Sequence, residues 1–145
     1  MNIEWDDREL QQALNTLVEK MPEQFENAVL NAGLAIEAEA KERCPVNTGA
    51  LRSSITTEVG KDGNDIVGYV GTTLEYAPYV HQGTGIYARE GNGRKDVPWF
   101  YFDEAKQTYV RTSGTKPTPF LEEARDAVQP HVLDYFTEVL RKCLN

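Results

Sequence analysis

The hydrophobic spacing of this chain changes at Pro45, and that change restricts the possible fold more than any other feature. Before Pro45, apolar residues recur at spacings of three and four, which predicts an amphipathic helix that ends by Cys44, since the residue before a proline avoids the helical region. From Ala50, apolar and polar residues alternate, as in a half-buried strand. Separate helical and strand-like segments indicate an α+β fold. The residues of the helical stripe are Phe25, Val29, Ala32, Ile36 and Ala40.

A first helix is predicted upstream of this one, capped by Asp6 or Asp7 and running to about Lys20. Pro22 is expected to end it and to open the second helix, since proline suits a first helical turn. The chain therefore begins with two predicted helices. The apolar stripe of the first consists of Leu10, Ala13, Leu14, Leu17, Val18 and Met21.

Two hairpins are predicted in the middle of the chain. The first joins alternating residues 51–59 to residues 66–72 through an Asp62-Gly63 turn, and the second joins 99–102 to 108–111. Residues 76–80 have the pattern of a single helical turn, and the glycine-rich, charged stretch 82–97 is expected to be a long exposed loop.

Thr115–Pro119 is predicted to be a stiff connector that leads into a C-terminal helix over residues 119–145, kinked or split at Pro130. The prediction is one α+β domain, residues 1–145. An antiparallel sheet of about four strands (45–118) packs on two N-terminal helices (1–44) and one C-terminal helix.

Charge and hydropathy exclude several classes of function. The net charge is −8, and the nearest approach to a basic patch, Arg89, Arg94 and Lys95, is diluted by Glu90 and Asp96. Specific nucleic-acid binding is not expected, because it usually needs a basic face. No apolar run is long enough for a membrane span, and the acidic N-terminus lacks the features of a signal peptide, so a cytoplasmic protein is expected.

No constellation of residues indicates catalysis, a cofactor or a metal. Gly83–Ala88 formally matches the Gly-x-Gly-x-x-Ala pattern of dinucleotide sites, but without the strand before it and the helix after it. The two cysteines and two histidines lack zinc-site spacing, and Cys44 and Cys143 are expected to be free thiols in a reducing compartment. A Cys44/His81 centre stays open as an enzymatic alternative.

Four consecutive aromatic residues, Trp99–Phe102, must place two side chains on each face of a strand. One face is expected to pack on helices, and the other is either covered by the loop or by Tyr109, or forms a partner site. The candidate assembly interface consists of Ile86, Tyr87, Arg89, Arg94, Lys95, Trp99 and Tyr101.

Three segments resemble a family of small tail-component proteins of tailed bacteriophages and prophages. Residues 44–55 resemble its P-V-D/N-T-G-x-L-R-x-S-I segment, residues 70–84 its V-G-T and Y-A-x-Y-V-x-x-G-T segments, and residues 119–121 its P-F-L helix start. Where the family often has Arg and Pro after P-F-L, this chain has Glu122 and Glu123. The resembling positions are Pro45, Asn47, Thr48, Gly49, Leu51, Arg52 and Ile55, then Gly71, Tyr76, Ala77, Tyr79, Gly83 and Thr84, then Pro119, Phe120 and Leu121.

Residues 47–52 are interpreted as a helix-to-strand junction, with Leu51 and Ile55 toward the core and Arg52 free for an intersubunit contact. The resemblance implies a non-enzymatic virion subunit that completes the tail or joins it to the head, within a ring at the neck. Its implied partners are other phage neck and tail proteins and further copies of itself, with DNA passing through the ring. It implies the host cytoplasm during assembly and then the virion. The alternative is a small non-enzymatic module that binds a host or phage protein.

Overall fold

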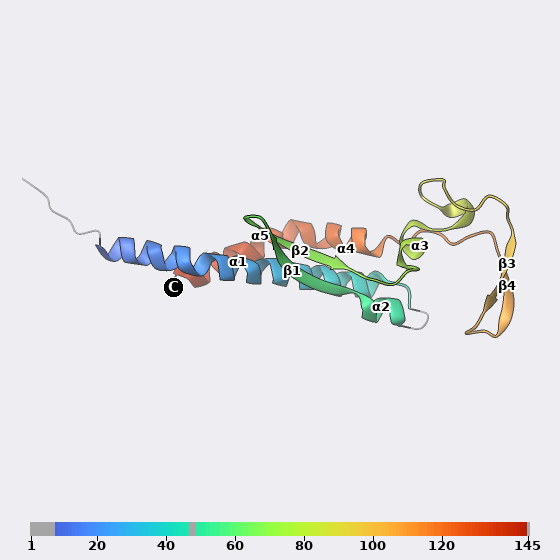
Figure 1. The fold of residues 1–145 in the computed structure, drawn as a ribbon, viewed down its shortest axis with the longest axis horizontal. Coiled ribbons are helices and arrows are strands. Elements are labelled where there is room, and N and C mark those ends of the chain that lie inside the picture. Colours follow the sequence, from blue (N-terminus) through green and yellow to red (C-terminus); the bar gives the residue numbers. More distant parts are fainter. Residues whose placement is uncertain (1–7, 47–48, 145) are drawn as a thin grey trace, which may run out of the picture.

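The computed structural model describes residues 8–46 and 49–144, which form an elongated molecule with a helical body and a narrow projection at one end (Figure 1). The α+β class and the two predicted hairpins are confirmed. Along the chain the elements are α1 (Arg8–Arg43), α2 (Ala50–Ser54), β1 (Thr56–Asp62), β2 (Asp65–Gly71), α3 (Ala77–Gln82), η1 (Gly85–Tyr87), β3 (Trp99–Asp103), β4 (Thr108–Thr112), α4 (Phe120–Val128), η2 (Gln129–His131) and α5 (Val132–Leu144).

Helix α1 is continuous through Pro22, so the prediction of two N-terminal helices was wrong in this respect. Proline has no N–H, which leaves the carbonyl of Val18 without its helical donor. Val18 is exposed, so water can satisfy that carbonyl and the helix continues. The predicted caps Asp6 and Asp7 lie outside the described residues.

Strands β1 and β2 form an antiparallel hairpin, from Thr56 opposite Gly71 to Asp62 opposite Asp65, and this hairpin lies along α1. The approach is close because glycines face it. A Cβ at Gly33 would lie 2.5 Å from the Thr57 methyl, and one at Gly68 would lie 2.9 Å from Val29. The Thr57 hydroxyl also donates to the Glu37 carboxylate at 2.7 Å.

Residues 50–54 form the short helix α2, and the strand begins only at Thr56. The prediction of a strand from Ala50 was therefore wrong over its first residues. The expected inward direction of Leu51 and Ile55 is confirmed, because both are buried. Gly49 precedes α2 with φ of 78°, a left-handed conformation that glycine adopts readily.

Helices α4 and α5 both pack on α1, and the chain between them passes through η2, so the expected split near Pro130 is confirmed. Phe25 of α1 contacts Phe136 of α5 with ring centroids 5.9 Å apart. No helix in the described part of the chain has the length and apolar character needed to cross a membrane.

Strands β3 and β4 form a second, separate two-stranded sheet, from Trp99 opposite Thr112 to Asp103 opposite Thr108. The four strands therefore do not join into one sheet on the helices. The second hairpin stands at the far end of the molecule from the free end of α1 (Figure 1). Residues 84–117, which include this hairpin and the loop before it, are called the arm below.

Candidate functional site

The three family-like segments meet in the core of the body. Leu51 and Ile55 from the first segment pack in one buried cluster with Ala77 from the second and Phe120 from the third. Phe120 and Ile55 are the largest fully buried side chains of the described residues. These motif positions therefore stabilise the fold, since removing such a side chain leaves a cavity.

Several other motif positions lie at or near the surface. Pro45, Arg52, Tyr76 and Tyr79 are exposed, while Gly71 and Leu121 are half-buried. Arg52 is accessible for the predicted intersubunit contact, which stays a prediction. Asn47 and Thr48 lie outside the described residues.

Gly83 and Thr84 begin the arm, and their backbone pairs with the segment that ends it. Thr84 N donates to Thr115 O at 2.9 Å, and Thr115 N donates to the Thr84 hydroxyl at 2.9 Å. Two further bonds, Ile86 N to Ser113 O at 3.1 Å and Thr118 N to Val80 O at 2.9 Å, extend the pairing. We call this set of contacts between residues 80–86 and 113–118 the clasp.

Glycines allow the clasp to close. Gly85 has φ of 61°, and a Cβ at this position would overlap Ser113 O. Gly83 has φ of 81°, and a Cβ there would lie 2.9 Å from Thr115 O and from the Pro117 ring. The loop 82–97, predicted to be simply exposed, is thus tethered by backbone bonds at its start, although residues 89–92 and 94–96 are exposed.

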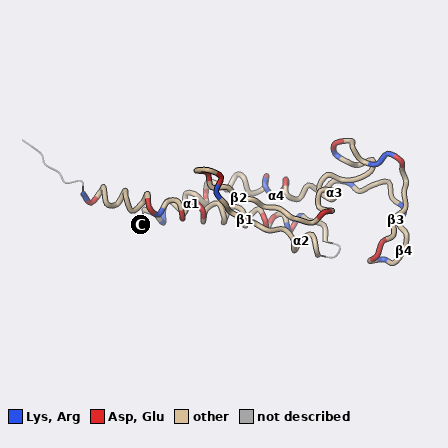
Figure 2. Tube along the Cα trace, in the orientation of Figure 1, with Lys and Arg blue, Asp and Glu red and all other residues tan. Residues whose placement is uncertain are grey.

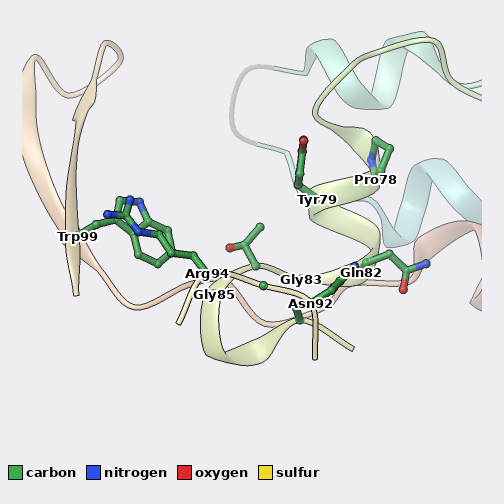
Figure 3. Close-up of a pocket in the computed structure, with 11 residues that line it drawn as sticks. Pro78, Tyr79, Gln82, Gly83, Gly85, Asn92, Arg94 and Trp99 are labelled. Atoms are coloured by element: carbon green, nitrogen blue, oxygen red, sulfur yellow. The ribbon is translucent and has the colours of Figure 1, made fainter. Parts of the chain in front are cut away.

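A cleft of about 370 Å³ lies between α3 and the arm. It brings together family-like positions (Tyr79, Gly83, Thr84) and two predicted interface residues, Arg94 and Trp99 (Figure 3). The Arg94 guanidinium lies 5.1 Å from the Trp99 ring centroid, a cation–π distance. The second family-like segment and the arm thus line the same cleft, a proximity that sequence spacing did not reveal.

Arg89, another predicted interface residue, forms an ion pair with Glu122 of α4, with N–O distances of 2.8 and 3.4 Å. The hydrogen bond from Arg89 lowers the pKa of Glu122 below its ordinary value. The pair links the loop of the arm to the body. The guanidinium of Arg89 is thereby already engaged within the chain.

The two faces of the second hairpin differ in exposure. Trp99 and Tyr101 share one face, and Trp99 is half-buried at the cleft. Phe100 and Phe102 lie on the other face with Tyr109, and Phe100 and Tyr109 are 65% and 71% exposed. Phe102 and Tyr109 contact each other edge to face, with ring centroids 5.3 Å apart. We call Phe100, Phe102 and Tyr109 the aromatic face of the arm.

One face of this hairpin was expected to pack on the helices, but neither face does so. The candidate interface predicted from the sequence did not include the residues of the aromatic face. The alternation of Trp99–Phe102 identified two faces but could not say which one turns toward the cleft. Of the predicted interface, Ile86 is exposed within the clasp and Tyr87 is exposed beside it. Lys95 is exposed in the loop, and Tyr101 is exposed on β3.

The groups considered for catalysis have other surroundings. Burial raises the pKa of the Cys44 thiol, the opposite of what activates a cysteine nucleophile. The His81 ring packs edge-on against Phe120 at 5.5 Å, and burial lowers its pKa. Cys44 and Cys143 are free thiols. Gly83–Ala88 follows a short helix and contains a 3-10 turn, which is not the strand-to-helix setting of a dinucleotide site.

Apolar side chains that are exposed together, as on this arm, often mark a contact site for another macromolecule. Residues 8–83, which are 76 of the 145 residues, match the family described as "Bacteriophage HK97-gp10, putative tail-component". The chain belongs to this family of phage tail components. The match spans α1 to the start of the clasp, while most of the arm and the C-terminal helices lie beyond it. Comparisons with curated proteins and with solved structures gave no match.

Proposed function

We propose that this tail component is a structural, non-enzymatic subunit of the virion. It completes the tail or joins it to the head, as one copy of a ring at the neck. The observation that carries the proposal is the aromatic face of the arm, which is exposed at one end of the molecule while the clasp fixes the base of the arm. Family membership supplies the setting in the phage tail.

The partners under this proposal are other neck and tail proteins and further copies of the chain. Assembly takes place in the host cytoplasm, and the finished protein resides in the virion. DNA passes through the ring without sequence-specific binding, consistent with a net charge of −8, because phosphates are attracted to basic surfaces.

Deletion of the gene in the phage or induced prophage is the direct test. Filled heads and separate tails are expected by electron microscopy, with infectivity restored by the wild-type chain from a plasmid. Complementation with Phe100→Thr/Phe102→Thr is expected to fail, whereas Tyr69→Thr, an exposed aromatic of β2, is expected to succeed. Normal infectious particles from the deletion would refute the proposal.

The rival function is a small module that binds a host or phage protein through the same aromatic face. Mass spectrometry of purified virions separates the two. An assembly subunit is found in particles at a fixed copy number, whereas the module is absent from them and is recovered in a stoichiometric host complex.

A further inference from the structure

The core-facing stripe of α1 continues beyond the elements that cover it. Leu10, Leu14 and Val18 are 58%, 50% and 65% exposed. They follow one another at spacings of four. From Val18, alternating spacings of three and four continue along the same face of the helix to residues that pack in the body. We call these three residues the apolar stripe. The residues further along the same face of the helix are Met21, Phe25, Ala28 and Ala32.

The geometry of α5 explains why Leu10 and Leu14, the first two residues of the apolar stripe, are uncovered. Helix α5 runs back along α1 from the Phe25–Phe136 contact and ends at Leu144 (Figure 1). Eight residues of helix advance roughly 12 Å, so Leu144 is level with about Leu17 of α1. Leu10 and Leu14 therefore lie past the end of α5, and at least half of each residue is exposed.

The aromatic face of the arm also lacks cover. An isolated two-stranded hairpin is marginally stable in water and gains stability from a third strand or from packing on a helix. Here β3 and β4 pair only with each other, and Phe100, Phe102 and Tyr109 are exposed. A helix that presents aliphatic side chains at spacings of four is a suitable cover for this face.

Charge favours contact between the arm and the body of another copy. The arm contains six basic and four acidic residues, a net charge of +2, whereas the rest of the chain has nine and nineteen, a net charge of −10. Residues 8–26, which include the apolar stripe, contain two basic and four acidic residues, a net charge of −2. Figure 2 shows these charges along both segments. Complementary charge selects partners and orientation at an interface.

We propose that the aromatic face of one copy packs on the apolar stripe of a second copy. The two surfaces lie at opposite ends of the elongated molecule, so one copy cannot bring its own together (Figure 1). The contact is head-to-tail, and repetition of such a contact closes a ring when the rotation between copies permits. This inference rests on the proposed function, for which it names the interface between copies.

The test uses one variant for each surface and a matched control for each. The arm variant is Phe100→Thr/Phe102→Thr, which keeps strand propensity, and the stripe variant is Leu10→Gln/Leu14→Gln, which keeps helix propensity. The controls are Tyr69→Thr and Leu133→Gln, which remove an exposed aromatic and an exposed leucine elsewhere. Circular dichroism verifies the fold of each, and analytical ultracentrifugation measures association.

Wild-type and control chains are expected to associate with the same dissociation constant, and each variant is expected to associate at least roughly tenfold more weakly. An equimolar mixture of the arm and stripe variants should form dimers and stop there, because each pair has one intact arm and one intact stripe. In a Cys143→Ser background, Val18→Cys and Tyr109→Cys chains should form a disulfide with each other on mild oxidation.

Two results would overturn the inference. One is an arm variant that loses association while the stripe variant keeps it, which indicates contact between two arms or between the arm and a different surface of the second copy. The other is a wild-type chain that stays monomeric and gives no mixed disulfide. A chain that assembles head-to-tail yet is absent from particles would refute only the proposed function. A wild-type chain that enters particles while the stripe variant does so equally well would refute only this interface.

Discussion

Gly85 is the residue on which closure of the clasp depends most directly. It combines a positive φ of 61° with a position at which a Cβ would overlap Ser113 O. Gly91 has a similar φ of 68° but open space around its Cα. The two glycines therefore separate the cost of backbone conformation from the cost of crowding.

We predict that Gly91→Ala costs roughly 1–2 kcal/mol at most, the penalty of a left-handed conformation. Gly85→Ala is expected to cost about 1–3 kcal/mol more, since added atoms in a packed site force neighbours to move. Denaturant unfolding followed by Trp99 fluorescence in a Trp5→Phe background measures both. Equal losses for the two variants would mean that the clasp is open in solution.

Glu37 connects α1 to the first hairpin. It accepts hydrogen bonds from Lys41 at 2.6 Å and from the Thr57 hydroxyl at 2.7 Å, and these bonds lower its pKa below the ordinary 4.5. A carboxyl whose pKa is lower in the folded state stabilises the fold above its unfolded pKa. That stability is lost as the pH falls through the folded value.

Glu37→Gln is therefore expected to be less stable than wild type at neutral pH, and the two unfolding free energies should converge below pH 4.5. Urea denaturation across this range provides the measurement, with Glu39→Gln as the control on the same helix. If the difference in unfolding free energy between the two chains stays constant down to the lowest pH, the hydrogen bonds of Glu37 contribute no pH-dependent stability.

At the scale of elements, the packing of the first hairpin on α1 depends on the absence of a side chain at Gly33. Alanine there would improve helix propensity by about 1 kcal/mol. Its Cβ, however, would lie 2.5 Å from the Thr57 methyl. Crowding at the helix–sheet contact opposes the gain in propensity.

We predict that Gly33→Ala destabilises the protein and that Thr57→Ser restores stability to it. Serine removes the crowded methyl and keeps the hydroxyl that donates to Glu37. A double-mutant cycle by thermal denaturation gives the coupling between the two positions, expected within about 0.5–3 kcal/mol. Additive effects would contradict direct contact between helix and strand at this point.

The elements that sequence could predict are those set by local patterns. The split of the C-terminal helix near Pro130 follows from the placement of the proline. The two hairpins and the helical turn near residues 76–80 follow from the alternation of apolar residues and from the turn residues. Residues 50–54 were misassigned because Leu51 and Ile55, four apart, share a face in a strand and in a helix alike. Pro22 was expected to break α1, but the carbonyl that it leaves without a donor belongs to Val18, an exposed residue.

The arrangement of the two hairpins could not be predicted, because their separation is a matter of non-local pairing. The same limit applies to the candidate site. The aromatic residues were recognised, but the orientation of the hairpin decides that Phe100, Phe102 and Tyr109 are the more exposed face. The Arg89–Glu122 pair, which joins positions 33 apart, left no local signal.

For the whole molecule, the elongated shape is a measurable property. A compact chain of this length has a radius of gyration of about 15 Å. Helix α1 alone, with 36 residues, is about 54 Å long. Small-angle X-ray scattering of the stripe variant, which isolates single copies, is expected to give a radius of gyration well above the compact value. A value near 15 Å would contradict the elongated shape.

The proline inside α1 has a consequence for the timing of backbone opening. Its missing hydrogen bond weakens the link between the N-terminal turns and the helix beyond. Residues 8–16 lie past the end of α5, and a helical segment of that length is marginal in water. Amides there are expected to exchange with deuterium far faster than those of residues 25–43 in a single copy, and Pro22→Ala should slow them. If copies associate through the apolar stripe as proposed, the same amides should become protected, so hydrogen exchange would report formation of that contact.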